Sequence, residues 1–295
     1  MQATPILLIG AQKSGSSYLF RLIAQEPCIA RAPLKEPKIL SKPMHDGSDF
    51  LSHFSISPDD RFALDGSTSY LHVAGTAERA AAQLGTDIPV LVVLRDPAER
   101  AISGYLHEVK HGRELRAPDE VFDLPLDPAA AIAAEDEGIE AAWRRGLVQP
   151  HNTASERYRD PVFGFRYVAN SWYRHQLAPW LAAFDDLRLV DFEELRSDPG
   201  GITAQVRAWL GLPAAATLSI IQGTNPTELH PWVALRENRA LAHDHIRPGL
   251  LDVWRRQRAL FRSLKAEKPR LQAELAEALR REFDILKQEE FARWL

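Results

Sequence analysis

The chain has 295 residues, of which 45% are hydrophobic and 26% charged, with a formal net charge of −4. This length suits one large α/β domain or two small ones, and the slightly acidic balance gives no overall electrostatic footprint for nucleic acid. No segment approaches the ~20 apolar residues of a membrane span, and the N-terminal apolar run is too short for a signal peptide. The single cysteine, Cys28, excludes an internal disulfide and fits a reducing compartment, so we expect a cytoplasmic protein.

Strand and helix patterns alternate over the first 112 residues. The apolar run at residues 6–9 predicts a buried strand, which leads through a loop with two glycines into a helix that starts at Ser16. Further strands are predicted at residues 28–30, 62–65 and 90–94, and an alanine-rich helix at 73–84. Residues 90–94 are entirely apolar, which indicates burial on both faces, as in a parallel sheet. This order predicts a doubly wound α/β fold that binds ligands at the carboxyl ends of its strands.

Three signals agree on a helix that begins directly after the strand at residues 90–94. Asp96 suits the N-cap, Pro97 suits the first helical position, and Glu99 suits the third position of a capping box. We expect this helix to end near Gly112.

The rest of the chain is predicted to be mainly helical. Residues 113–160 are rich in proline and charge, with one alanine-rich helix near 128–145, and we interpret them as an insertion or lid. The elements predicted beyond them are a long helix, a strand, a helix and C-terminal amphipathic helices, at residues 165–184, 187–190, 200–211 and 250–295. We interpret residues 1–295 as a single domain.

The loop between the first strand and the first helix has the features of an anion site. A strand that feeds a Gly/Ser loop and then a helix directs backbone N–H groups and the positive helix end at one point. Lys13 adds a full charge, and three hydroxyl groups add donors, on Ser14, Ser16 and Ser17. The loop differs from the nucleoside triphosphate motif GxxxxGK[ST], because its lysine precedes Gly15 instead of following it. A plain turn with incidental serines is the alternative.

Two segments of the chain resemble the motifs of sulfotransferases that use 3′-phosphoadenosine 5′-phosphosulfate (PAPS). Residues 13–17, Lys-Ser-Gly-Ser-Ser, are similar to the family's 5′-phosphosulfate loop. Residues 94–105 resemble its 3′-phosphate motif, in which an arginine after a strand and a serine two turns into the helix bind the 3′-phosphate. The resemblance implies a P-loop-like parallel sheet flanked by helices, with PAPS as co-substrate and no required metal.

Within this family the chain looks most like the heparan-sulfate-type branch and its bacterial relatives. The supporting segments are Lys35-Glu36-Pro37-Lys38, Asp65-Gly66-Ser67-Thr68-Ser69-Tyr70, and residues 171–173 and 191–199. This branch implies that Glu36 is the general base toward the acceptor, and the charges of Lys35 and Lys38 would stabilise its carboxylate. His107 is the rival base, because the cytosolic branch of the superfamily uses histidine.

The resemblance assigns the remaining site residues one by one. Lys13 would stabilise the departing 5′-phosphate, and the loop residues Ser14, Gly15, Ser16 and Ser17 would hold its oxygens. Arg95 and Ser103 would bind the 3′-phosphate; a surface arginine paired with Asp96 or Glu99 is the alternative for Arg95. Arg100 is expected to make a structural salt bridge. Tyr70 and Tyr173 are candidates either for the wall of the site or for core packing.

The chain departs from the branch at two places. A lysine near position 66 of the heparan-type enzymes is replaced here by Gly66, which weakens the case for a polyanionic sugar acceptor. The C-terminal Lys-Gly-Arg loop of those enzymes has no clear counterpart, although residues 225–231 or 236–239 are candidates.

The expected activity is sulfuryl transfer to a hydroxyl, less readily an amine, of a small molecule or glycan. An ATP-dependent kinase is one alternative, which would need a lysine after Gly15 and a magnesium-holding aspartate, with Asp65 and Asp191 as candidates. A non-catalytic nucleotide-binding protein is the other; it would keep Arg95 and Ser103 without needing Lys13 or Glu36. The acceptor and the oligomeric state stay open.

Overall fold

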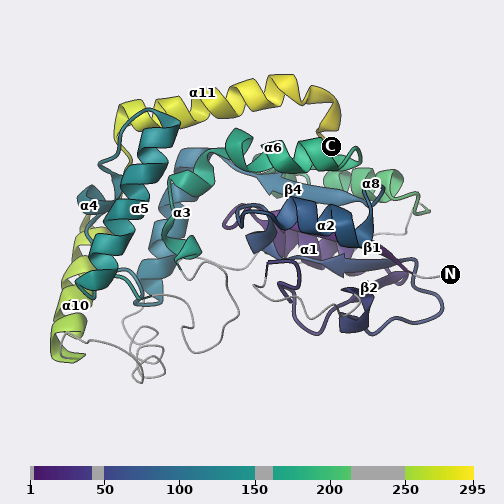
Figure 1. Cartoon of the computed structure of the whole chain (residues 1–295), viewed down its shortest axis with the longest axis horizontal. Helices are drawn as coiled ribbons and strands as arrows, with labels where there is room; N and C mark the ends of the chain where they lie inside the picture. The colour runs from purple at the N-terminus through teal and green to yellow at the C-terminus, as the bar shows by residue number, and fades with distance from the viewer. Residues whose placement is uncertain (1–2, 42–49, 150–161, 214–249) are drawn as a thin grey trace. The chain divides into compact units, whose positions relative to one another are not determined.

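The structure is a computed structural model that describes residues 3–41, 50–149, 162–213 and 250–295 (Figure 1). The chain divides into two compact units. Unit 1 comprises Met1–Arg95, Arg174–Thr224 and Ile285–Leu295, and unit 2 comprises Asp96–Tyr173 and Asn225–Asp284.

Unit 1 is built on a five-stranded sheet in which every pair of neighbouring strands is parallel. The strands are β1 (Thr4–Gly10), β2 (Ile29–Arg31), β3 (Phe62–Asp65), β4 (Val90–Leu94) and β5 (Leu187–Asp191), in the order β2-β3-β1-β4-β5. All five residues of β4 are buried, as the continuous apolar run predicts. The predicted α/β class and parallel sheet are confirmed, and the carboxyl ends of the strands share one edge.

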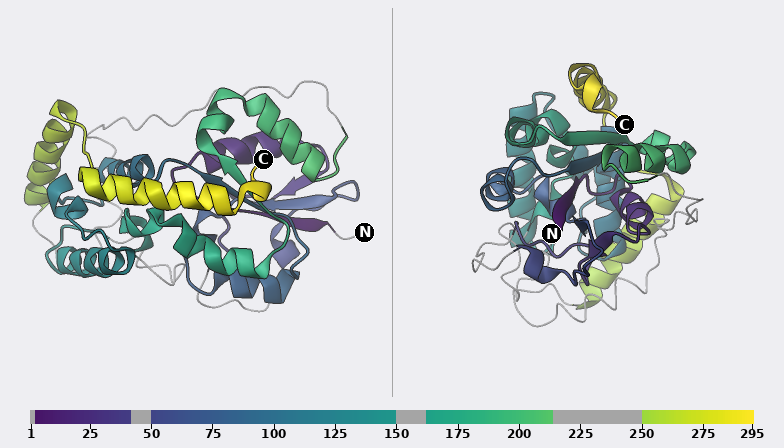
Figure 2. Two further views of the ribbon diagram at one scale, coloured as in Figure 1. Left: turned by 90° about the horizontal axis from the view of Figure 1, so that it is seen from above. Right: turned by 90° about the vertical axis from the view of Figure 1, so that its right-hand side faces the viewer.

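Helices cover both faces of this sheet (Figure 2). They are α1 (Ser16–Ile23), α2 (Thr76–Leu84), α6 (Tyr173–Ala183), α7 (Phe192–Ser197) and α8 (Pro199–Trp209). The views place α1 and α8 on one face and α2 and α6 on the other. Alternate strand residues such as Ile6 and Leu8 join α1 and α8 in one apolar core, because successive strand side chains point to opposite faces.

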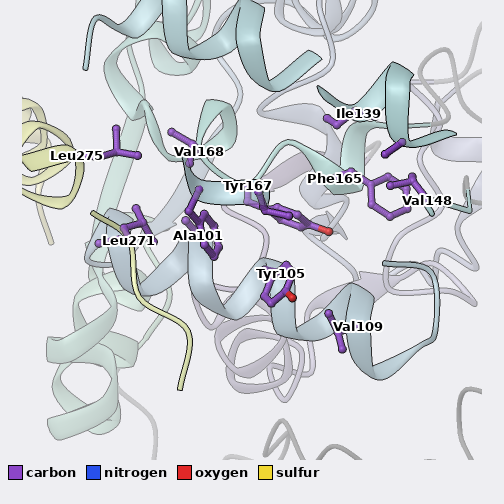
Figure 3. Packing of buried hydrophobic residues seen from close by; sticks show 14 of the residues in the cluster. Ala101, Tyr105, Val109, Ile139, Val148, Phe165, Tyr167, Val168, Leu271 and Leu275 are labelled. Carbon is purple, nitrogen blue, oxygen red and sulfur yellow. The ribbon is translucent and has the colours of Figure 1, made fainter. Parts of the chain in front are cut away.

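Unit 2 consists of helices around a second apolar core. Its helices are α3 (Pro97–Lys110), α4 (Pro118–Phe122), α5 (Pro128–Arg144), α10 (Leu250–Ala266) and α11 (Ala273–Glu289), whose last residues belong to unit 1. Figure 3 shows Ala101, Tyr105 and Val109, spaced four residues apart, on one side of α3. Tyr105 meets the ring of Tyr167 edge-on, with 5.7 Å between the ring centroids.

Residues of the predicted insertion contribute to this second core. Leu115, Phe122, Ile139 and Val148 are all buried in it. The part of residues 113–160 that the structure describes is therefore packed into unit 2. The interpretation of the whole chain as one domain stays a prediction.

The predicted long helix at residues 165–184 is wrong in its first half. The chain there forms two 3₁₀ turns, Phe163–Phe165 and Ala169–Ser171, and the α-helix begins only at Tyr173. The carboxylate of Glu135, on α5, accepts the backbone N–H groups of Val168 at 2.8 Å and Ala169 at 2.7 Å. Because these two N–H groups donate to a side chain on another helix, they are not available for the hydrogen bonds within a continuous helix.

Other element boundaries differ less from the prediction. Helix α2 begins at Thr76 instead of residue 73, because Gly75 has a positive φ of 72° at its N-cap. The short helix α7 between β5 and α8 was not predicted. At α3 the expected cap is present: the Asp96 carboxylate accepts the N–H of Glu99 at 2.9 Å, and Gly112 follows the helix with a φ of 72°.

Candidate active site

The loop from β1 to α1 lies at the carboxyl edge of the unit 1 sheet. Gly15 is the N-cap of α1 and has a φ of 88°, in the left-handed region that favours glycine. A Cβ atom at this position would lie only 2.8 Å from Cδ2 of Phe192. Lys13 also has a positive φ, of 69°, a conformation that non-glycine residues adopt rarely and mostly where their surroundings fix it.

The start of α1 is suited to an anion. The first N–H groups of a helix have no acceptor within the helix and carry its positive end, and the first turn of α1 contains no acidic residue. The side chain of Ser14 is fully buried, and within the described residues its Oγ has no hydrogen-bond partner. A buried hydroxyl without a partner is costly, and an oxyanion bound in the loop would satisfy it. Ser16 is buried, whereas Ser17 is exposed.

Glu36 lies in a cluster of donors next to this loop. Its Oε1 accepts hydrogen bonds from Lys35 Nζ at 2.9 Å and from Thr68 Oγ1 at 3.2 Å, and Lys38 Nζ lies 3.8 Å from Oε2. Lys35 Nζ is also 3.4 Å from the hydroxyl of Ser16, in the first turn of α1. The candidate base and the candidate anion site are thus joined through one ammonium group. The Glu36 side chain remains 29% exposed, so an acceptor can approach it.

The segment after β3 holds the Glu36 segment in place. The Ser67 hydroxyl accepts the N–H of Lys38 at 2.9 Å, and the Tyr70 hydroxyl accepts the N–H of Leu40 at 3.2 Å. Tyr70 in turn donates to Asp65 at 2.7 Å, at the end of β3. Burial raises the pKa of Asp65 to about 6, and burial also raises the pKa of Tyr70 well above its usual value. Fully buried Tyr70 is therefore an anchor of this segment and does not line an exposed wall.

Arg95 follows β4 at the same edge of the sheet. Its guanidinium lies over the ring of Phe192, with 4.9 Å between Cζ and the ring centroid, a cation–π arrangement. The same ring lies against Gly15, so Phe192 is in contact with two segments that the sequence assigns to the nucleotide. Sequence reasoning gave Phe192 no role. Its position directly after β5, at the ligand-binding edge, was the available signal.

Ser103 and His107 belong to unit 2, where both lie on α3 and are half-buried. The ring of His107 is 4.5 Å from that of His111. Arg100 is buried and donates to the backbone oxygen of Tyr167 at 3.1 Å, so its described contact is a hydrogen bond to a carbonyl and not the expected salt bridge. Burial lowers the pKa of Arg100.

Tyr173 is packed against another aromatic residue of unit 2. It is buried, and its ring meets Phe283 at 5.5 Å in an edge-on arrangement. Of the two roles that the sequence left open for Tyr173, the structure shows core packing. Both candidate counterparts of the C-terminal loop, residues 225–231 and 236–239, lie outside the described residues.

The described residues include neither a metal-binding cluster nor a membrane-spanning helix. No group of three or more His, Cys, Asp or Glu side chains among them is arranged to hold a metal ion. None of the described helices combines the length and apolar character needed to cross a membrane.

A family model described as the sulfotransferase domain matches residues 3–294, which is nearly the whole chain. The chain therefore belongs to the sulfotransferase domain family, as its resemblance in the loop and after β4 predicts.

Its curated relatives include heparan-sulfate enzymes. The chain is 27% identical over 219 residues to bifunctional heparan sulfate N-deacetylase/N-sulfotransferase 4 of Mus musculus and to bifunctional heparan sulfate N-deacetylase/N-sulfotransferase 3 of Homo sapiens. Each match covers 70% of this chain but only 22% of the relative, so the matched region spans about a fifth of those proteins.

Among solved structures, a sulfotransferase from Alicyclobacillus acidocaldarius is similar in fold. The TM-score is 0.57 at 24% identity, and the match covers 86% of this chain and 100% of that one. At this level of identity the likeness concerns the fold alone.

Proposed function

We propose that this protein transfers a sulfuryl group from PAPS to a hydroxyl group of a small molecule or glycan. The observation that carries the proposal is that the N-terminus of α1, which is suited to bind an anion, lies close to the carboxylate of Glu36. The ammonium group of Lys35 contacts both. The buried hydroxyl of Ser14, which has no hydrogen-bond partner among the described residues, and the first N–H groups of α1, which no described side chain caps, fit the 5′-phosphosulfate end of the donor. Glu36, exposed in part and surrounded by donors, fits the base.

Sulfuryl transfer of this kind depends on positioning and on charge neutralisation. The S–O bond to the bridging oxygen of the 5′-phosphosulfate breaks as a new S–O bond forms to the acceptor oxygen, roughly in line. Glu36 takes the proton of the acceptor hydroxyl. Lys13 and the loop N–H groups stabilise the charge that develops on the departing phosphate. Adenosine 3′,5′-bisphosphate is the product.

The 3′-phosphate is assigned to Arg95 and Ser103 on the sequence motif. A planar guanidinium can donate two hydrogen bonds to one phosphate, which suits Arg95 to this role. The ring of Phe192 under Arg95 supports the assignment, because it would keep the guanidinium at the carboxyl end of β4.

An amine acceptor is the second possibility for the transferred group. The mouse and human relatives are named as N-sulfotransferases of heparan sulfate, and nitrogen is the acceptor that this name gives. A labelled-sulfate screen should therefore pair each alcohol, phenol and glycan with its amine analogue. Preferential labelling of the amines would replace the hydroxyl in our proposal.

The kinase alternative needs a magnesium-holding aspartate, and the contacts of both candidates, Asp65 and Asp191, weaken it. The Asp65 carboxylate is bonded to the N–H of Ser67 at 2.8 Å and to Tyr70. Asp191 accepts the N–H of Glu193 at 2.7 Å and pairs with Lys287. Both carboxylates are engaged by the protein itself and are poorly placed to hold magnesium.

Thermal unfolding with nucleotides tests the proposed donor. Adenosine 3′,5′-bisphosphate without magnesium should raise the melting temperature by about 5 °C at about 100 times its dissociation constant, and ATP with magnesium should raise it much less. Lys13→Met should remove most of the shift. Lys268→Met, which changes an exposed lysine in unit 2, should leave it intact. The opposite ranking of the two nucleotides would exclude PAPS as the donor.

A further inference from the structure

We propose that Lys35 is a catalytic residue whose ammonium group binds the sulfuryl group of the donor during transfer. This inference rests on the proposed function and extends it, because it adds a second cation to Lys13 at the reacting end of the site. Three features of the side chain carry the proposal: where its ammonium lies, how its methylene chain gets there, and which donors remain on it.

The ammonium of Lys35 lies between the two partners of the reaction. On one side it is 3.4 Å from Ser16 Oγ, at the helix start assigned to the 5′-phosphosulfate. On the other side it is 2.9 Å from Glu36 Oε1, the oxygen of the candidate base. A sulfuryl group that passes from donor to acceptor must travel between these two groups, so Lys35 is adjacent to its path.

The methylene chain of Lys35 uses space that a side chain at position 66 would take. A Cβ atom on Gly66 would lie 3.2 Å from Cε of Lys35 and 2.6 Å from Cδ2 of Phe20. The N–H of Gly66 also donates to the backbone oxygen of Lys35 at 3.1 Å, which keeps the two segments together. Lys35 therefore brings a positive charge to the space beside Gly66.

The remaining donor of Lys35 suits an oxyanion. An ammonium group has three N–H donors, and in the described part of the chain its two contacts are with Glu36 and Ser16. The third donor can therefore reach a sulfuryl oxygen. The positive charge of Lys35 also offsets the repulsion between the Glu36 carboxylate and the anionic nucleotide. Such repulsion is stronger in a partly buried site than in water, because the effective dielectric constant is lower there. At 23% exposure, the side chain is accessible to a bound nucleotide.

Binding measurements with two nucleotides that differ only in the sulfuryl group test this role. In titration calorimetry, Lys35→Met should weaken PAPS binding on the order of 10-fold and change binding of adenosine 3′,5′-bisphosphate by less than about 2-fold, since that product lacks the sulfuryl group. Lys35→Arg should retain most of the preference for PAPS. Lys268→Met is the matched control on the surface, and circular dichroism checks that each variant is folded.

Kinetics then separate a catalytic role from a positioning role. We expect Lys35→Met to lower kcat on the order of 10²-fold, as removal of other preorganised charge contacts does. Equal weakening of both nucleotides would assign Lys35 to the phosphate loop instead. Unchanged binding of both, with a displaced pH profile of kcat, would make it only a positioning residue for Glu36. Either result overturns the proposal, whereas wild-type protein that binds neither nucleotide would overturn the proposed function itself.

Discussion

Single residues in the loop after β1 are under conformational and electrostatic constraints at once. Gly15 must have a positive φ and must lack a side chain, because the ring of Phe192 occupies the space beside it. Ser14 is buried, and its hydroxyl finds no partner in the described part of the chain, a cost that a bound oxyanion would remove. The glycine and serine pattern is visible in the sequence and predicts the anion site. The position of Phe192 directly after β5 is visible too, but its contacts with Gly15 and Arg95 could not be predicted, because they depend on how α7 follows β5.

Replacement of the candidate base provides a prediction at the level of one residue. Glu36→Gln should lower the rate of sulfuryl transfer by about 10²-fold or more, because an amide cannot take the acceptor proton. It should leave the affinity for adenosine 3′,5′-bisphosphate unchanged or slightly higher, since one negative charge is removed near the anion. Steady-state kinetics and calorimetry measure the two effects.

An exposed glutamate serves as the control for that variant. Glu193→Gln changes a partly exposed side chain that pairs with Arg196, and we expect normal transfer. Full turnover by Glu36→Gln would move the base to His107 or to solvent.

At the level of elements, the segment after β3 determines where the segment carrying Glu36 lies. The two segments are far apart in sequence but are joined through Ser67, Tyr70 and backbone N–H groups of residues 38 and 40. The strand at 62–65 could be predicted from its apolar run, and the following Gly-Ser-Thr-Ser-Tyr segment was recognised by resemblance. Its hydrogen bonds to the Glu36 segment could not be predicted, since no local pattern specifies which backbone donor a distant hydroxyl will accept.

Removal of one hydroxyl tests this anchoring. Tyr70→Phe should destabilise the protein by about 1–3 kcal/mol, because buried Asp65 loses a donor and the N–H of Leu40 loses an acceptor. We expect kcat to fall about 10-fold as the Glu36 segment loosens, with nucleotide affinity nearly unchanged. Urea unfolding, kinetics and calorimetry give the three values.

Tyr105→Phe is the matched control for Tyr70→Phe. Its buried hydroxyl donates to the backbone oxygen of Arg116 at 2.9 Å in unit 2. The variant should lose stability in the same range while kcat stays within about 2-fold of wild type. An equal loss of kcat in both variants would mean that general destabilisation, and not anchoring, explains the effect of Tyr70→Phe.

At the level of the whole molecule, each unit has its own apolar core and its own buried polar groups. In unit 2, Arg116 forms a buried ion pair with Glu114, at 2.7 Å between Nη2 and Oε2, and Tyr167 donates to the same oxygen at 3.0 Å. Such a pair is stable only when its remaining donors and acceptors are satisfied, which the surrounding hydrogen bonds achieve. The composition of residues 113–160, rich in proline and charge, favoured an insertion. It did not reveal that several of these charges are buried together.

Glu135 makes the stability of the molecule depend on pH. Burial raises the pKa of Glu135 from 4.5 to about 7, so the folded state binds its proton more tightly than the unfolded state does. The associated stability is fully present below about pH 4.5 and is lost as the pH rises through about 7. Asp65, with its raised pKa of about 6, acts in the same direction. The positive charge of Arg100 opposes this effect, because it lowers the pKa of Glu135, but burial has the larger effect.

The Glu135→Gln variant isolates this contribution. It should be less stable than wild type, because one of the backbone N–H groups of residues 168 and 169 loses its carboxylate acceptor. Between about pH 5 and about pH 7.5, the free energy of unfolding should nevertheless fall less for the variant than for wild type. The difference between the two falls should be on the order of 1–3 kcal/mol. Urea unfolding across that range measures both curves. Parallel curves for the two proteins would show that Glu135 does not titrate there.

Local patterns were enough to predict the parallel α/β sheet and the family, because apolar strands and short motifs each span only a few residues. The anion loop, predicted from a glycine-containing turn, stays a prediction. Three features depend on three-dimensional packing. Lys35 joins Ser16 to Glu36, and Phe192 contacts both Gly15 and Arg95. Glu135 binds backbone N–H groups within the segment 165–184, where a continuous helix was expected. Apart from the bond between the neighbours Lys35 and Glu36, each of these contacts joins segments that are distant along the chain. Packing and burial select them, and no local pattern of residues encodes that selection.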